Sequence, residues 1–181
     1  MPRYAAFLRG MNLGGRRITN TDLCAHVAAM GFDEVGSFRA SGNLVVTTPK
    51  AEQVAAVARR IEEGLAEALG YSVPTFVRTD EQMHTMAGHV PFSAKELDAS
   101  TGKVQVILLQ KEPTAAAAQQ SLAHQTDQDR LHIHDQQLYW LPSGGMSDSD
   151  LDLKALEKAL GPTTIRTKGT IDQITTKFFS I

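Results

Sequence analysis

The strongest constraint on the fold is an order of secondary-structure patterns that occurs twice along the chain. In each half, an apolar run precedes an amphipathic stretch, two short runs, a second amphipathic stretch and a last short run. Short apolar or alternating runs favour strands, and apolar residues three or four positions apart favour helices. The order strand, helix, strand, strand, helix, strand is typical of the ferredoxin-like fold. We therefore predict an α+β protein of two ferredoxin-like βαββαβ subdomains in tandem, with antiparallel sheets, helices on one face and a closing C-terminal helix.

Turn and cap residues give the expected boundaries of these elements. In the first half we expect strands at 4–9, 35–40, 44–48 and 73–78, a helix from Thr19 to Gly31 and a helix from Pro49 to Gly70. Pro74 cannot donate a ladder hydrogen bond, so the fourth strand belongs at a sheet edge. In the second half we expect strands at 103–110, 130–134, 138–141 and 163–167, and helices at 113–124, 150–160 and 170–179. A helix at 80–90 and an irregular connector at 89–102 join subdomains 1–80 and 103–181.

Composition excludes several classes of protein. The chain has 181 residues with a single cysteine, which excludes an intrachain disulfide framework and a cysteine-based zinc cluster. The net charge of −2 argues against nucleic-acid binding through bulk positive charge. No apolar run approaches the roughly 18 residues of a membrane span, and the N-terminus lacks the pattern of a signal peptide. We expect a cytoplasmic protein without cofactor, metal or membrane association, as a monomer or homodimer.

One candidate site lies near the N-terminus, where four arginines precede the first acidic residue, Asp22. In a ferredoxin-like unit, strands one and three are neighbours, and the end of strand one meets the hairpin between strands two and three. A phosphate or carboxylate suits the guanidinium groups, the glycine-rich backbone and the helix N-terminus gathered there. The candidate ligand-binding residues are Arg9, Asn12, Gly14, Gly15, Arg16, Arg39, Ser41 and Asn43. A tight turn with solvated arginines is the alternative, because no known phosphate-loop motif is present.

A secondary cluster is expected in the second half. The loop that follows the second hairpin carries Ser147 and should lie at the sheet end where Arg166, Lys168 and Thr170 emerge. For Ser147 and Ser149 we favour capping of a helix at Asp150, with a ligand role as the alternative. The acids Asp148, Asp150 and Asp152 follow this loop and would repel an anion, so the N-terminal corner should dominate. His132 and His134 share one strand face, which we interpret as solvated, because no further metal-ligand cluster is visible.

Three sequence segments resemble a known bacterial family. The opening YAAFLRGMNLGG, the stretch GFDEVGSFRASGNLVV and the closing TTIRTKGTI are similar to motifs of the family called domain of unknown function 1697. The family's usual Asn-Pro-Phe is here His89-Val90-Pro91-Phe92, without the Asn. Of its usual Thr-Thr-Arg-Asn-Trp-Asn-Thr, the residues at 164–170 keep Arg166 and Thr170 but not the Asn-Trp-Asn core. The resemblance implies an α+β protein of two related subdomains and supplies no established reaction.

Three functions fit these observations. The first is a protein that binds a small anionic ligand at the N-terminal Gly/Arg loop. The second is an enzyme acting on a phosphorylated or carboxylated metabolite, in which Arg9 and Arg16 stabilise negative charge and Ser41 or Asn43 orients the substrate. The third is an RNA-binding or protein-interaction module with exposed aromatic side chains on its sheets. We favour the first, since the sequence offers no general base near the corner beyond Asp22, whose expected role is helix capping.

Overall fold

The structure, a computed structural model, describes residues 1–39 and 42–180, so Ser41 of the candidate site lies outside the described residues. The chain divides into two compact units. One comprises Met1–Met86 with the C-terminal residues from Ile174 onward, and the other comprises Ala87–Gln173. Within the described ranges, no helix combines the length and the apolar character needed to cross a membrane.

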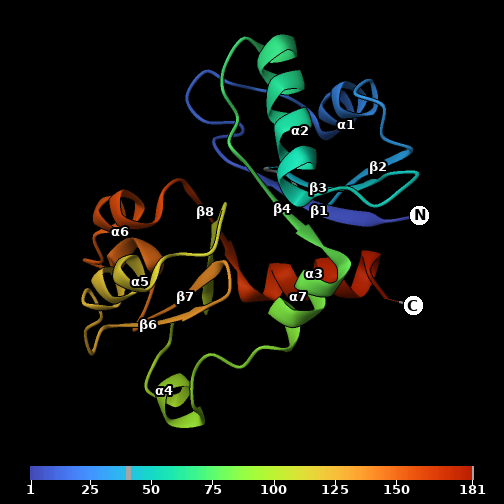
Figure 1. The fold of residues 1–181 in the computed structure, drawn as a ribbon. Coiled ribbons are helices and arrows are strands. Elements are labelled where there is room, and N and C mark those ends of the chain that lie inside the picture. The colour runs from blue at the N-terminus through green and yellow to red at the C-terminus, as the bar shows by residue number, and fades with distance from the viewer. Residues whose placement is uncertain (40–41, 181) are drawn as a thin grey trace. The chain divides into compact units, whose positions relative to one another are not determined.

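The first unit contains the predicted βαββαβ order (Figure 1). Its elements are β1 (Arg3–Leu8), α1 (Asn20–Ala28), β2 (Glu34–Ser37), β3 (Asn43–Thr47), α2 (Val54–Leu69) and β4 (Thr75–Thr79). The sheet has the order β2-β3-β1-β4 with antiparallel neighbours throughout, so the fold prediction is confirmed. Strand β4 follows Pro74 directly and lies at the edge, as its proline requires.

Helices α1 and α2 pack against one face of this sheet. Leu23 and Val27 of α1 join Val57, Ile61 and Leu65 of α2 and the inward residues of β1 and β3 in one apolar core. Thr19 caps α1 through its hydroxyl, which accepts the N–H of Asp22 at 3.1 Å. Gly70 ends α2 with the left-handed φ of 79° that favours glycine.

Two predicted boundaries in this unit are wrong for identifiable reasons. Helix α2 begins at Val54 instead of Pro49, because the backbone at Glu52 is held on the sheet by Tyr4. The Tyr4 hydroxyl accepts the N–H of Glu52 at 2.8 Å and donates to its carbonyl at 3.0 Å. Strand β2 ends at Ser37, before the predicted end, since Arg39 has a φ of +57° that no strand accommodates.

The C-terminal segment of the chain completes the first unit. Helix α3 (Asp80–Gly88) buries Met83 and Met86, and it ends before Val90, the predicted end of this helix, which is exposed. Helix α7 (Lys168–Phe178) ends in this unit, where a guanidinium nitrogen of Arg3 donates to the carbonyl of Phe178. The ring of Phe178 also contacts Phe38 edge-on, with centroids 6.4 Å apart.

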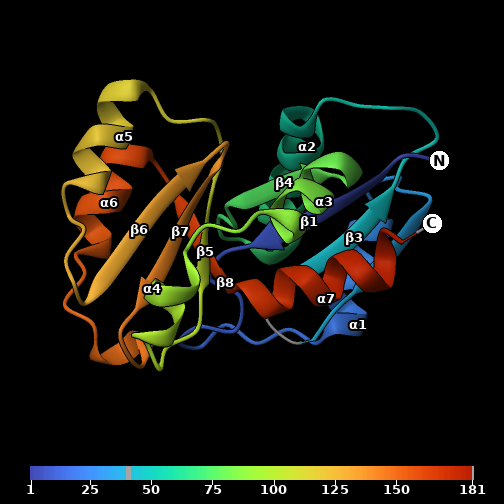
Figure 2. The same ribbon diagram turned by 90° about the horizontal axis from the view of Figure 1, so that it is seen from below.

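The second unit repeats the same topology (Figure 2). Its elements are α4 (Ala94–Asp98), β5 (Gln105–Leu109), α5 (Ala115–Leu122), β6 (Asp129–His134), β7 (Gln137–Pro142), a 3-10 turn η1 (Met146–Asp148), α6 (Leu153–Leu160) and β8 (Thr163–Thr167). The sheet order is β6-β7-β5-β8, again antiparallel. Ile107, Leu138 and Trp140 of this sheet share a core with Leu156 and Leu160 of α6.

Two expectations for the second unit are corrected by local hydrogen bonds. The connector expected to be irregular contains α4, which a full capping box between Ser93 and Glu96 starts. The helix expected at Asp150 begins at Leu153, because Asp152 is its cap and accepts the N–H of Ala155 at 3.0 Å. The Ser149 hydroxyl bonds to Asp129 instead of capping a helix.

The turn at Gly42 gives a test of the first unit's packing. A Cβ on Gly42 would lie 2.8 Å from Leu8 Cβ and 2.9 Å from Met11 Cγ, and its φ of +80° disfavours other residues. We expect Gly42→Ala to lower the free energy of unfolding by about 1–3 kcal/mol in urea denaturation.

Gly15→Ala is the matched control for that substitution. Gly15 has no positive φ, and a Cβ at this position would meet no atom within 4 Å. Its substitution should therefore change the free energy of unfolding by less than about 0.5 kcal/mol. Equal losses in the two variants would contradict the packing role assigned to Gly42.

Candidate functional site

Three chain segments meet at the N-terminal corner of the first unit. Residue 7 pairs with residue 43 across β1 and β3, and the N–H of Leu8 donates to the carbonyl of Gly42 at 2.8 Å. The side-chain amide of Asn20, the first residue of α1, donates to the carbonyl of Arg39 at 2.8 Å. The end of β1, the connection between β2 and β3 and the start of α1 therefore form one corner, as the sequence predicted for the fold.

The loop between β1 and α1 has a defined shape. Asn12, in the left-handed region with a φ of 58°, accepts the N–H of Ile18 on its Oδ1 at 2.9 Å. Asn12 thus spans the loop with its oxygen, and its Nδ2 has no acceptor among the residues that the structure describes. Gly14 and Gly15 are exposed, and within the described ranges their backbone N–H groups have no acceptor either. The loop consequently presents hydrogen-bond donors to solvent.

The guanidinium groups of this corner differ in their surroundings. The guanidinium of Arg16 lies over the ring of Tyr71, 4.0 Å from its centroid, directly after the turn at Gly70. Arg16 and Arg17 are exposed and have no carboxylate partner in the described part of the chain. Arg39 is also exposed and lies near the ring of Phe38, whereas Arg9 is half-buried and its backbone N–H donates to the carbonyl of Pro74 at 3.0 Å. Arg16, a predicted binding residue, and its neighbour Arg17 are therefore open to a ligand from solvent.

Asn43, which we predicted to contact the ligand, is instead buried beneath the corner. It is 5% exposed, and its Nδ2 donates to the carbonyl of Phe38 at 3.1 Å. This hydrogen bond closes the connection between β2 and β3 beneath the corner. Asn43 therefore shapes the corner from within, while the arginines and the glycine N–H groups form its surface.

The secondary cluster is used mainly for internal contacts. The ends of β7 and β8 lie at the same end of the second sheet, as predicted, with β5 between them. Lys168 donates to the carbonyl of Ala87 and to Asp172, and the Thr170 hydroxyl bonds to that of Thr167 at 2.9 Å. Arg166 bonds to Thr164 and Ile165, and burial lowers the pKa of Arg166 to about 10. Ser147 is exposed in η1.

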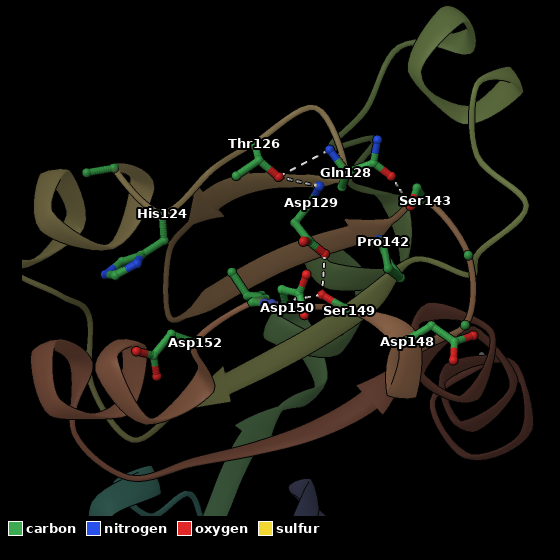
Figure 3. Close-up of a pocket in the computed structure, with 14 residues that line it drawn as sticks. His124, Thr126, Gln128, Asp129, Pro142, Ser143, Asp148, Ser149, Asp150 and Asp152 are labelled. Atoms are coloured by element: carbon green, nitrogen blue, oxygen red, sulfur yellow. Dashed lines mark hydrogen bonds between the residues drawn. The ribbon is translucent and has the colours of Figure 1, made fainter.

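A pocket of about 630 Å³ lies at that same end of the second sheet. Figure 3 shows its labelled aspartates around the hollow, drawn from the start of β6 and from the segment between β7 and α6. The acidic lining residues are Asp129, Asp148, Asp150 and Asp152, and the lining contains no lysine or arginine. We expected three of these acids, Asp148, Asp150 and Asp152, to repel an anion, and nothing in the sequence indicated that Asp129 would join them.

The second site that sequence reasoning missed is a histidine cluster on the sheet of the second unit. His89 stacks on His134 with ring centroids 4.0 Å apart and on His132 at 5.1 Å. Tyr139 pairs with His132 across β6 and β7, and the centroid of its ring lies 5.1 Å from that of His89. We expected the face of His132 and His134 to be solvated, but it is half-buried, because His89 stacks on both rings. The alternation of the two histidines in the strand was visible, but nothing in the sequence placed His89 against them.

The cluster changes the protonation of its members. Burial lowers the pKa of His89 below its ordinary 6.5, and the neighbouring His134 and His132 lower it further. Asp135 opposes this shift weakly, and Lys168 adds to it. Burial and His134 also lower the pKa of His132, against a small opposing effect of Glu96. Near neutral pH, these two rings are therefore neutral.

The lowered pKa values predict a pH-dependent stability. Because native His89 and His132 bind protons less readily than in the unfolded chain, the stabilisation is intact above about pH 6.5 and falls as the pH drops toward the native pKa. Urea unfolding at about pH 7.5 and about pH 5 should show this loss. The loss should be smaller in His89→Gln and unchanged in His26→Gln, a histidine outside the cluster. An equal pH dependence in all three proteins would contradict the account.

We compared the chain with curated proteins, solved structures and protein-family models. No curated protein matches it. Among solved structures, it is similar to the conserved bacterial protein SP0830 from Streptococcus pneumoniae, with 17% identity, a TM-score of 0.69 and coverage of 97% of each chain. This likeness supports the fold alone. The family model of DUF1697, a protein family of unknown function, matches residues 1–139. Since this match spans most of the sequence, the chain belongs to the DUF1697 family.

Proposed function

We propose that the first unit binds a small anionic ligand, one that bears a phosphate or carboxylate group, at the N-terminal Gly/Arg loop. The main support for this proposal is the hydrogen bond that joins the end of β1 to the β2–β3 connection, in which the carbonyl of Gly42 accepts the N–H of Leu8 at 2.8 Å. This junction brings the loop after β1 against the connection that contains Arg39. Charge and hydrogen-bond donors from segments about 30 residues apart are thereby gathered on one exposed corner.

The chemistry of the open groups favours an anion. The N–H groups of Gly14 and Gly15 and the Nδ2 of Asn12 are donors, and the corner has no acceptor for them among the described residues. Arg16 and Arg17 add two positive charges without a carboxylate partner in the described ranges. The adjoining N-terminus of α1 contributes the positive end of the helix dipole. A phosphate offers enough acceptor oxygens to use several of these donors together.

Tyr71 supports the site by restraining one of its cations. A guanidinium over an aromatic face gains roughly 0.5–1 kcal/mol at an exposed position, which limits the freedom of the Arg16 side chain. Ordering Arg16 before the ligand arrives reduces the entropy that binding costs. The turn at Gly70 places Tyr71 for this contact, so the end of α2 contributes to the corner without supplying a ligand.

The electrostatics of the second unit support the choice of this corner. The loop that carries Gly144 and Gly145 also offers glycine backbone, but it lines the pocket with four carboxylates. A phosphate there would face like charges, whereas the N-terminal loop from Gly10 to Ile18 carries two arginines and no acid. The same ligand is therefore expected at the first corner and not at the second.

Substitution of the open arginines tests the proposal. Binding of inorganic phosphate, pyrophosphate and nucleoside triphosphates is measured by thermal shift and calorimetry. The best of these anions at roughly 100 times Kd should stabilise the protein by about 2.7 kcal/mol. Arg16→Ala and Arg17→Ala should each raise its Kd by about 5-fold to 30-fold, because each removes a charge-assisted contact.

Two further variants make the test specific. Arg59→Ala removes the same charge from an exposed position on α2 and should change Kd by less than about twofold. Tyr71→Ala should weaken binding about 3-fold, and Tyr71→Phe, which keeps an aromatic face, should not. An equal loss in Arg59→Ala, or no stabilisation by any of these anions, would refute the proposed function.

A further inference from the structure

The first unit has a second candidate site on the face of its sheet opposite helices α1 and α2. Strands β1, β2 and β3 and the end of helix α7 line a hollow of about 330 Å³ there, which we call the sheet hollow. We propose that the sheet hollow binds a small apolar amino acid in its zwitterionic form. Its volume lies within the range of small-molecule sites. Arg3 of its lining begins β1, whereas the Gly/Arg loop follows the other end of this strand, so the two sites are separate.

The pairing of the strands gathers three polar side chains on this face. Val46 and Tyr4 belong to the core beneath α1 and α2, so their neighbours Thr47 and Arg3 point to the other face. Thr47 pairs with Arg3 on one side and with Glu34 on the other. Adjacent strands lie about 4.8 Å apart, so the Cα atoms of the acid and the cation are separated by about 10 Å. The register of the sheet therefore positions a carboxylate and a guanidinium on either side of one hydroxyl.

The Thr47 hydroxyl is the observation that points to a ligand. Thr47 is 2% exposed, and its Oγ1 is buried without a hydrogen-bond partner among the described residues. Buried hydroxyls are usually hydrogen-bonded, because withdrawal from water without a partner is unfavourable. The neighbouring Thr48 hydroxyl, in contrast, donates to the carbonyl of Lys50 at 2.7 Å. Since Thr47 lines the sheet hollow, a polar group bound there can supply the missing partner.

The charged groups of the sheet hollow make no ion pairs within the described ranges. This holds for the Glu34 carboxylate, the Lys177 ammonium and the Arg3 guanidinium. Glu34 and Lys177 are exposed, and Arg3 is half-buried. Arg3 donates through one guanidinium nitrogen to the carbonyl of Phe178 and keeps further N–H groups for a ligand. An ammonium group suits Glu34 and a carboxylate suits the two cations, so a molecule with both charges uses all three residues.

Apolar groups complete the sheet hollow. Val45, which is 5% exposed, lies on the same face of β3 and pairs with Gly36. A Cβ on Gly36 would lie 3.6 Å from the Phe178 ring, so this ring reaches down to the sheet. The ring also restrains Lys177, whose Nζ lies 5.1 Å from its centroid. An aliphatic side chain fits beside these groups, whereas an inorganic anion would leave them and Glu34 unused.

Calorimetry on the full chain tests the class of ligand. L-Alanine, L-valine and L-leucine are the probes, and at least one should bind saturably with a Kd below about 1 mM. The deaminated and the decarboxylated relatives of the best binder each lack one of its charges. For leucine these relatives are isocaproate and isoamylamine. Each should bind at least about tenfold more weakly than the amino acid, because each loses a charge-assisted contact.

Three substitutions of charged residues locate the site. Lys177→Met keeps the length of the side chain and should raise the amino-acid Kd at least about fivefold. Glu34→Gln should raise it about threefold or more without weakening the deaminated relative, which has no ammonium group for this carboxylate. Lys50→Met removes a positive charge from an exposed residue of the same unit outside the lining and should change Kd by less than about twofold.

Thr47→Val separates ligand binding from a structural role of the hydroxyl. This nearly isosteric change removes a group that has no partner to lose among the described residues. Urea unfolding of the free protein should therefore show no loss of stability. The same change should raise the amino-acid Kd about threefold or more, because the ligand loses a hydrogen bond.

Each other result would overturn the proposal. No saturable binding of the three amino acids at concentrations up to about 10 mM would refute the site. Equal binding of the deaminated relative would make it a simple carboxylate site, and an equal loss in Lys50→Met would leave only a diffuse attraction of charges. A loss of stability in Thr47→Val would give its hydroxyl a structural role. Because the anion test uses Arg16 and Arg17, failure of either proposal leaves the other standing.

Discussion

The contact between Gly42 and the end of β1 is the constraint on which the N-terminal corner depends. The pairing of β1 with β3 fixes the register, and the hydrogen bond from Leu8 to Gly42 holds the turn against the root of the loop. There is no room for a side chain at Gly42, since a Cβ would overlap Leu8 and Met11. A larger residue would push apart the two segments that carry Arg16 and Arg39, so one position without a side chain links the packing of the sheet to the charge on its edge.

The two units share a topology but differ in which loop is long. In the first unit the chain between β1 and α1 carries the extra residues, and in the second the chain between β7 and α6 does. These loops occupy opposite ends of their sheets, because strands one and three of each unit are antiparallel. The first loop contains arginines and the second contains aspartates. We therefore expect the anion site of this family member to lie in the first of these two long loops, which carry opposite charge, and the shared βαββαβ fold to hold it in place.

Much of the fold could be predicted because local signals agreed with the global arrangement. Thr163–Thr167 forms a strand with the predicted bounds, Pro74 marks the edge strand, and Gly70 ends its helix. Some errors arose from local features that were overlooked, such as the capping box of Ser93 that starts α4, and others arose where a distant residue decides the local structure. Tyr4 holds Glu52 and delays α2, and Asp129 engages Ser149. His89 reaches the face of His132 and His134 through a tertiary contact that no short-range pattern encodes. The candidate corner followed from topology, but the inward role of Asn43 required its hydrogen bond to Phe38.

Mapping a bound anion onto individual backbone amides tests the central claim most directly. The measurement is a ¹H–¹⁵N correlation spectrum of the full chain during titration with pyrophosphate. The account predicts saturable shifts of the Gly14 and Gly15 amides, which are exposed and have no acceptor within the described ranges. The amides of Gly144 and Gly145, beside the carboxylates of the second unit, should stay unchanged. Shifts centred on Gly144 and Gly145, or none at Gly14 and Gly15 at saturation, would contradict it.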